Sequence, residues 1–156
     1  MSLKLTFAME EEEEELREIL WEHGMDIAGD IGDHMVMRDQ GEIVAGGKIC
    51  ELEEKHFYLM VIGVKDGWSG HGYGGLLLDK MTGKPWDCCR NPLSDDDGGC
   101  YVVTTVARGS AVHFYEKHGF APCDFAEIPQ PFREQCTGCP EKEGCAPVAM
   151  MMNGGK

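Results

Sequence analysis

The stretch WSGHGYGGLLL, residues 68–78, places four glycines within six positions and then turns apolar. Glycine loses more conformational freedom on folding than other residues, so this cluster indicates a backbone that turns sharply or approaches another group closely. The three leucines and Met81 supply an apolar helix face, and Gly83 and Pro85 mark the end of that helix. The glycines therefore open a helix, and three uses stay open for them: a cradle for phosphate, a contact with a packed neighbour, or a flexible loop.

Strands and helices alternate on both sides of this helix. Apolar runs and alternation predict the strands, and apolar residues at helical spacing predict the helices. The predicted strands are 4–8, 34–39, 42–53, 56–64, 100–107 and 147–152, and the predicted helices besides the glycine-led one are 10–23 and 110–118. A tight hairpin turn is expected at Gln40 and Gly41. Residues 84–99 are rich in turn formers, and so long a connection is either mobile or functional.

Length and charge limit the classes of protein to which the chain can belong. Its 156 residues predict a single domain over 1–156. With 14 Lys and Arg against 28 Asp and Glu, the formal net charge is -14, which repels nucleic acid and anionic lipid. No segment reaches the roughly 18 apolar residues of a membrane span, and the opening MSLKLTF is not a targeting leader, so we expect a cytoplasmic protein with reduced cysteines.

Two nucleotide-binding patterns can be tested against the glycines. Gly70, Gly72 and Gly75 match the dinucleotide fingerprint G-x-G-x-x-G between a strand and a helix. A second parallel strand and an acidic residue about 20 positions on should follow, and this chain has the irregular stretch DCCRNPLSDDDGG, residues 87–99, there. A nucleoside-triphosphate loop fails because Leu76 stands where a lysine should follow the last glycine.

The segment from Val64 onward resembles the acyl-CoA-binding motif of the GNAT superfamily of N-acetyltransferases. In that motif a strand ends in Val, and a helix opens with Gln or Arg, two residues, Gly, one residue, and Gly or Ala. Gly72 and Gly74 match the two small positions, and Ser69 replaces the usual Gln or Arg. Consecutive backbone N–H groups at a helix start can bind a pyrophosphate without a basic side chain, so weaker affinity is expected rather than loss of the site.

A second segment, SAVHFYEKHGF at 110–120, resembles the other recurrent segment of the same superfamily. Its matching residues are Ala111, Phe114, Tyr115, Gly119 and Phe120. Two matches in the family's order, each preceded by an apolar strand, identify the chain as similar to GNAT enzymes. The resemblance is good over 57–78 and 101–120, weak before residue 57 and poor over 121–156.

The resemblance implies an α/β fold, with a mixed, strongly twisted sheet flanked by helices, and acetyl-CoA as cosubstrate. It implies transfer of an acetyl or short acyl group to a primary amine, which attacks the thioester directly. The strand before the glycines and the strand after the helix are expected to splay apart around the pantetheine arm. The cofactor-binding residues implied are Ile62, Gly63, Val64, Ser69, Gly70, His71, Gly72, Tyr73, Gly74 and Gly75. Tyr115 stands at the position of the family's general acid, which protonates the leaving thiolate.

The general base and the acceptor are not identified by any motif. A carboxylate near the 56–64 strand is common in the family, and the nearby titratable residues are Glu51, Glu53, Glu54 and His56. Arg108 replaces an Asn that is frequent seven residues before the tyrosine. The acidic surface suits a cationic amine, on a small molecule or a protein, and loops 21–34 and 84–99 are expected to select it. A homodimer is the usual oligomer for such enzymes.

The Cys-rich segment 136–145 lies outside the resemblance. Cys136, Cys139 and Cys145 form a C-x2-C-x5-C cluster, which makes them candidate ligands of zinc or another metal, although structural zinc wants four donors. A disulfide, free thiols and an iron–sulfur site are the alternatives. Cys50 and Cys100 fall in strand-like sequence and are expected in the core.

Two other functions stay open beside the transferase. One is a catalytically idle domain that senses acyl-CoA, and the other is a cysteine-centred metal or redox module. A transferase binds the cofactor and turns it over, whereas a sensor binds it without turnover. A metal or redox module binds metal and does not bind CoA.

Overall fold

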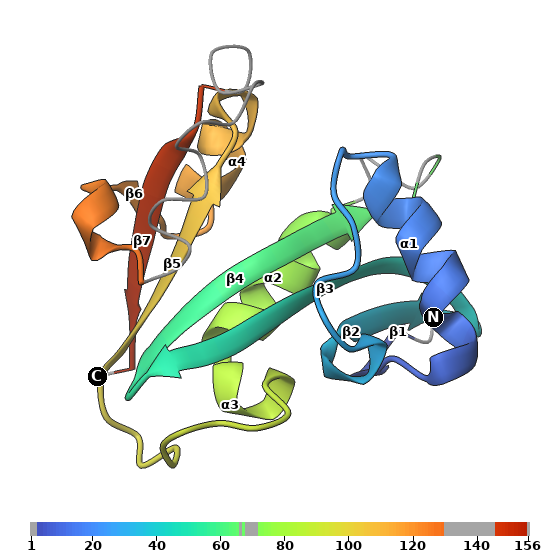
Figure 1. The fold of residues 1–156 in the computed structure, drawn as a ribbon, viewed down its shortest axis with the longest axis horizontal. Helices are drawn as coiled ribbons and strands as arrows, with labels where there is room; N and C mark the ends of the chain where they lie inside the picture. The colour runs from blue at the N-terminus through green and yellow to red at the C-terminus, as the bar shows by residue number, and fades with distance from the viewer. Residues whose placement is uncertain (1–2, 66, 68–71, 130–145, 156) are drawn as a thin grey trace. The chain divides into compact units, whose positions relative to one another are not determined.

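The computed structural model describes residues 3–65, 67, 72–129 and 146–155 of the chain (Figure 1). Its strands are β1 (Leu3–Phe7), β2 (Met35–Asp39), β3 (Glu42–Glu53), β4 (His56–Val64), β5 (Tyr101–Ala107), β6 (Ala121–Pro122) and β7 (Val148–Gly154). Its α-helices are α1 (Glu13–Trp21), α2 (Tyr73–Gly83), α3 (Pro85–Cys88) and α4 (Val112–Glu116).

The described strands form a mixed sheet in the order β1-β2-β3-β4-β5-β7-β6. The pairs β1–β2, β2–β3, β5–β7 and β6–β7 are antiparallel, and β4 and β5 are parallel. The predicted α/β class with a mixed sheet flanked by helices is confirmed. The chain divides into two compact units, Met1–Cys50 with Leu59–Pro92, and Glu51–Tyr58 with Leu93–Lys156.

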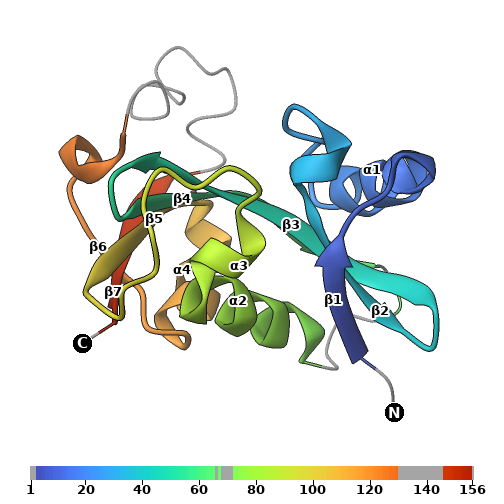
Figure 2. The same ribbon diagram turned by 90° about the horizontal axis from the view of Figure 1, so that it is seen from below.

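In the first unit, α1 lies on one face of the strands and α2 with α3 on the other (Figures 1 and 2). The apolar residues of α1 form a core with the strands, whose buried members are Ala8, Leu16, Ile19, Leu20, Val36 and Ile43. The predicted hairpin turn is confirmed, since Gln40 and Gly41 both take positive φ, 54° and 85°. That geometry is the one that two-residue hairpins favour.

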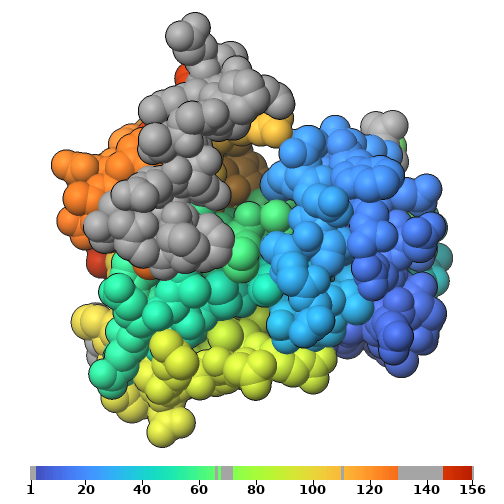
Figure 3. All heavy atoms as spheres, viewed as in Figure 1, coloured from blue at the N-terminus to red at the C-terminus, as the bar shows by residue number. Residues whose placement is uncertain are grey.

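Gly47 lies where the backbones of β3 and β4 come close together. A Cβ atom at this position would lie 2.5 Å from the Val61 carbonyl oxygen, which is backbone and cannot rotate away. The residue is therefore required by packing rather than by a turn. In the same unit α1 and the loop after it lie side by side on the surface (Figure 3), where Arg17 Nε donates to Asp26 at 3.3 Å.

In the second unit, β5 pairs with β7 along its whole length, from Tyr101↔Gly154 to Ala107↔Val148. The rings of Phe57 and Tyr101 meet edge to face at 6.1 Å. Aromatic pairs in this arrangement stabilise a core beyond the area that they bury. The final strand was predicted over 147–152, and β7 confirms it with a shift of one or two residues.

Three sequence expectations differ from the structure. The stretch 87–99 is not wholly irregular, because its first two residues belong to α3, which begins at Pro85, where a missing N–H costs nothing. The helix expected over 110–118 is a 3-10 turn followed by the five residues of α4. Cys100 is exposed just before β5 rather than in the core, because the chain has not yet entered the sheet there.

Candidate active site

The first turn of α2 holds the described part of the glycine cluster. Gly72 is the N-cap with φ 81°, a left-handed conformation that a Cβ would strain. The Leu76 N–H donates to the Gly72 carbonyl at 3.0 Å and begins the helical ladder. Gly74 and Gly75 follow in the first turn of α2, where no described side chain caps the helix, and the N–H groups of a first turn have no partner within the helix itself. The helix start can therefore bind an anion.

Ser69, Gly70 and His71, which the sequence also assigns to this cradle, lie outside the described residues.

Tyr73, the first residue of α2, ties this helix to β2. Its hydroxyl donates to Asp39 Oδ2 at 2.8 Å, and this bond raises the pKa of Tyr73 above its ordinary value. Asp39 is only 8% exposed, and its Oδ1 has no partner among the described residues. The bond fixes the start of α2 against the sheet across 34 positions of sequence.

The last residues of β4 carry the predicted pantetheine site. Ile62 and Val64 are half-buried and Gly63 is buried. The parallel ladder to β5 joins only the first three residues of β4 and ends at Tyr58↔Thr104. The Lys65 N–H donates to Val44 of β3 at 2.8 Å, so the Val64 carbonyl, on the opposite side of the same peptide plane, points away from β3. This strand edge is the one predicted to face the cofactor.

His23, just beyond the end of α1, occupies this edge of β4. Its Nε2 lies 2.7 Å from the Val64 carbonyl oxygen. Its ring packs against Gly63, where a Cβ would be 3.0 Å from His23 Cδ2. Nothing in the sequence singled out His23, because it is joined to Val64 across 41 positions and no motif includes it.

Tyr115 belongs to α4 in the second unit and is 8% exposed. Its ring contacts those of Phe114 and Phe120, with centroids 5.2 Å and 5.4 Å away. Burial raises the pKa of Tyr115 to about 12, and a hydrogen bond with Thr105 offsets part of this rise. The phenol is therefore protonated at neutral pH and available as a donor.

Glu51, one of the four candidate bases, is a structural carboxylate. It is 5% exposed and accepts from the main-chain N–H groups of Lys55 at 2.6 Å, Leu93 at 2.5 Å and Ser94 at 2.9 Å, and from the Ser94 hydroxyl. Burial favours protonation, but these hydrogen bonds together lower the pKa of Glu51 below its ordinary value. Its carboxylate oxygens accept hydrogen bonds that hold Leu93 and Ser94 of segment 84–99 in place.

His56 is the candidate base that the structure distinguishes. Its Nε2 lies 2.9 Å from Thr104 Oγ1, and its Nδ1 lies 3.8 Å from a Glu53 oxygen. Burial lowers the pKa of His56, while Glu53 and Glu127 partly oppose this shift. A neutral imidazole can accept a proton. Glu53 and Glu54 are exposed carboxylates at the β3–β4 turn.

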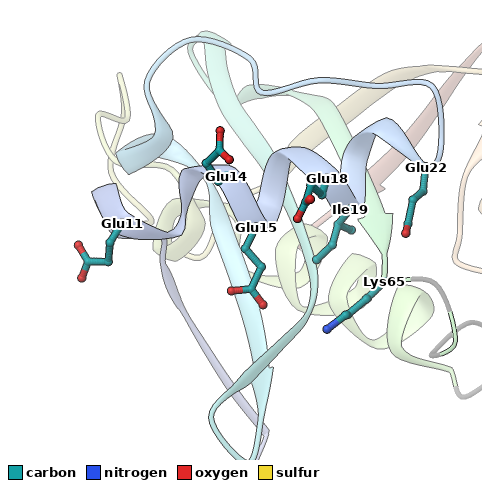
Figure 4. Close-up of a pocket in the computed structure, with 7 residues that line it drawn as sticks. All are labelled: Glu11, Glu14, Glu15, Glu18, Ile19, Glu22 and Lys65. Atoms are coloured by element: carbon teal, nitrogen blue, oxygen red, sulfur yellow. The ribbon is translucent and has the colours of Figure 1, made fainter.

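The outer face of α1 forms an open acidic groove of about 570 Å³ (Figure 4). Its lining residues are Glu11, Glu14, Glu15, Glu18, Ile19, Glu22 and Lys65. Lys65, the one cation among these described lining residues, is paired with Glu42 at 2.7 Å. The groove therefore presents negative charge to solvent.

The described strands form a mixed sheet flanked by helices, and α2 begins at the left-handed Gly72. Residues 30–122 match the acetyltransferase (GNAT) domain family, and the chain belongs to this family of acyltransferases.

Solved structures share the fold at low sequence identity. One is N-acetylglutamate synthase from Neisseria gonorrhoeae, complexed with coenzyme A and N-acetyl-glutamate (TM-score 0.73, 12% identity, covering 98% of this chain and 35% of that chain). Another is Naa50 from Arabidopsis thaliana, complexed with a bisubstrate analogue, CoA-Ac-MVNAL (TM-score 0.61, 14% identity, covering 97% of this chain and 98% of that chain). A third is the ribosomal-protein-S18-alanine N-acetyltransferase from Escherichia coli (TM-score 0.61, 12% identity, covering 99% of this chain and 94% of that chain). This chain thus spans about a third of the synthase and nearly all of the other two.

The cysteine cluster cannot be placed, because Cys136, Cys139 and Cys145 lie outside the described residues, and zinc binding there stays a prediction. Within the described ranges, no three His, Cys, Asp or Glu side chains gather as a metal site. None of the described helices is long and apolar enough to cross a membrane.

Proposed function

We propose that the chain moves an acetyl or short acyl group from CoA to a primary amine, which attacks the thioester carbonyl directly. The observation that carries the proposal is the start of α2, where Gly72 is left-handed and no described side chain caps the first turn that holds Gly74 and Gly75. It follows a strand whose ladder to β5 ends early.

The cofactor is held mainly by backbone. The pyrophosphate takes the amides at the start of α2, together with those of Ser69, Gly70 and His71, and the helix dipole adds favourable charge. Pantetheine runs along Ile62–Val64 and pairs with main-chain groups of that edge. The Val64 carbonyl has two lone pairs, so His23 can keep its hydrogen bond while an amide of pantetheine binds the same oxygen.

Tyr115 is the proposed general acid. Its pKa of about 12 lies about 3.5 above that of an ordinary thiol, so complete proton transfer to a free thiolate costs about 5 kcal/mol. The phenol therefore donates a hydrogen bond to the sulfur while the carbon–sulfur bond breaks, and the released thiolate takes its proton from solvent. This assignment uses the protonated phenol that burial maintains.

His56 is the proposed base that takes the proton of the incoming ammonium, directly or through water. Its lowered pKa keeps the imidazole neutral at physiological pH. Glu53, 3.8 Å from Nδ1, stabilises the imidazolium that forms.

The acceptor is an amine on a small molecule or a protein. The net charge of -14 and the acidic groove along α1 favour a cationic acceptor such as a polyamine, an aminoglycoside or a lysine side chain. We further propose a single domain over 1–156, a cytoplasmic enzyme and a homodimer.

Acetyl-CoA titration and thiol release across a panel of primary amines test the function. We expect micromolar to millimolar acetyl-CoA binding, of the order typical for enzyme substrates, and thiol release that depends on the amine. Binding without release for any amine supports the idle sensor instead. Stoichiometric zinc or iron in protein purified under reducing conditions, with no CoA binding, supports the cysteine-centred module.

A further inference from the structure

A cavity of about 140 Å³ lies in the first unit, where the two loops expected to select the acceptor meet. Loop 21–34 contributes Asp33, strand β3 contributes 48–50, and insert 84–99 contributes 89–91. The lining residues are Asp33, Lys48, Ile49, Cys50, Cys89, Arg90 and Asn91. We call this space the Lys48–Arg90 cavity.

Both cations of the cavity are held in place by main-chain carbonyls of the same loop. Lys48 Nζ donates to the Ala28 carbonyl at 2.6 Å, and Arg90 Nε donates to the Gly32 carbonyl at 2.9 Å. The Arg90 guanidinium also lies over the Phe7 ring, 4.2 Å from its centroid. These contacts orient both side chains before any ligand arrives, which lowers the entropy cost of binding.

Neither cation has a carboxylate partner within the described ranges, although the chain has twice as many acids as bases. Each uses one donor on a carbonyl, so two N–H groups of Lys48 and four of Arg90 remain for another acceptor. Arg17, Arg38, Lys55 and Lys65 each have an acidic partner. Two unpaired cations beside one cavity indicate a site for an anion.

The rest of the lining limits the charge of that anion. Asp33 contributes one negative charge, so the lining carries a net charge of about +1, which suits a monoanion better than a dianionic phosphate. Burial raises the pKa of the Cys50 thiol to about 11, so it adds no charge at neutral pH. The planar fork of Arg90 matches the two oxygens of a carboxylate.

We propose that the Lys48–Arg90 cavity binds a small carboxylate. The carboxylate belongs either to a free acid that acts as an effector or to the amine acceptor itself, and the second source rests on the proposed function. Cofactor binding is not involved, so the site can be tested without acetyl-CoA.

Calorimetric or NMR titration of the full chain with acetate is the first test, with methylammonium chloride as the probe that lacks a carboxylate. We expect saturable acetate binding that weakens about tenfold or more in Lys48→Gln and in Arg90→Gln, since each removes a charged hydrogen bond. Lys65→Gln removes a paired cation elsewhere in the same unit and should bind acetate as the wild type does. Equal binding by all four proteins, or none by the wild type, overturns the proposal.

Asp33→Asn should change acetate affinity in the opposite direction. A gain in affinity cannot be explained by a variant that fails to fold. Removing the negative charge from the lining should tighten acetate binding several-fold, because the repulsion at this site disappears. Arg90→Lys keeps the positive charge but loses the planar guanidinium, so its acetate affinity should lie between those of the wild type and Arg90→Gln. Melting temperatures of all variants identify any that fail to fold, and unchanged affinity in a folded Asp33→Asn contradicts the assignment.

An amino acid and the amine that lacks its carboxyl group separate the two sources. If the acceptor supplies the carboxylate, Lys48→Gln raises KM for the amino acid about tenfold and leaves KM for the amine unchanged. If a free acid binds, added acetate changes the rate with both acceptors. Should no amine be acetylated, the acetate titrations still decide the site, so failure of the proposed function and failure of this inference give different results.

Discussion

The two compact units contribute different kinds of groups to the proposed reaction. The first unit offers backbone: the edge of β4 at Ile62–Val64 and the amides at the start of α2. The second unit offers titratable side chains, the buried phenol of Tyr115 and the imidazole of His56. Most side-chain substitutions should therefore leave cofactor binding intact, whereas substitutions of glycines should weaken it. Turnover should be lost when a single catalytic side chain is replaced.

Replacing Tyr115 with Phe should have the largest effect. We expect kcat to fall about 10²-fold, the usual contribution of a positioned acid, while KM for acetyl-CoA changes little. Steady-state kinetics with acetyl-CoA varied measure both constants. Tyr101→Phe, which removes another buried phenol of the same unit, is the matched control and should keep its kcat. Unchanged turnover in Tyr115→Phe removes this residue from the mechanism.

Replacing His56 with Gln should lower kcat/KM at neutral pH about tenfold or more. Because burial lowers the pKa of His56 below 6.5, the wild-type rate should fall as the pH drops below that value and the base becomes protonated. A pH profile of kcat/KM from about pH 5 to 9 measures this limb, which should vanish in His56→Gln. Should the limb persist unchanged in the variant, another group is the base.

Replacing Glu51 with Gln tests whether a carboxylate of the second unit acts in folding rather than in chemistry. Its folded pKa is lowered, so its contribution is present above the ordinary pKa of 4.5 and is lost as the pH falls through the folded value. We expect unfolding free energy to drop by about 1–2 kcal/mol at neutral pH. Urea denaturation near neutral pH and below 4.5 checks this, since the difference from wild type should shrink in acid.

Glu53→Gln changes an exposed carboxylate nearby and serves as the control for Glu51→Gln. It should leave stability nearly unchanged, as exposed ion pairs contribute little. A lower kcat in folded Glu51→Gln would return Glu51 to the list of bases.

Replacing Gly72 with Ala should have the smallest effect. Its φ of 81° strains an L-residue by about 1 kcal/mol, which shifts the turn and weakens acetyl-CoA binding about fivefold. Gly41→Ala carries the same strain at φ 85°, also with open space around a Cβ, in the β2–β3 hairpin. Both variants should lose similar stability, and only Gly72→Ala should lose affinity for CoA. Equal affinities in the two variants would contradict the cradle.

Sequence reasoning predicted the elements that depend on local pattern. Strand β4 begins and ends where the apolar run 56–64 predicted, and the hairpin at Gln40 and Gly41 follows from turn chemistry. It was wrong about the start of the stretch 87–99, whose first two residues belong to α3, and about Cys100, which is exposed. Strand-like composition cannot show at which residue a chain enters the sheet.

The candidate site could be predicted only where a motif covers it. Two segments with family resemblance predicted Gly72–Gly75 and Tyr115, and each segment is recognised from a few neighbouring residues. The four candidate bases were equivalent in sequence, and burial and hydrogen bonding alone separate Glu51 from His56. His23 was missed because its contact with Val64 depends on the packing of α1 against β4.

By itself, the sequence determined the order of strands and helices, the glycine-led start of α2 and the acidic charge, because each depends on composition or on short-range pattern. The tertiary structure decided which distant side chains meet: Tyr73 with Asp39, Glu51 with Ser94, and Lys48 with Arg90 around one cavity. The first two contacts join residues 34 and 43 positions apart. No local pattern encodes such pairs, since they arise when the packing of whole elements brings separate segments together.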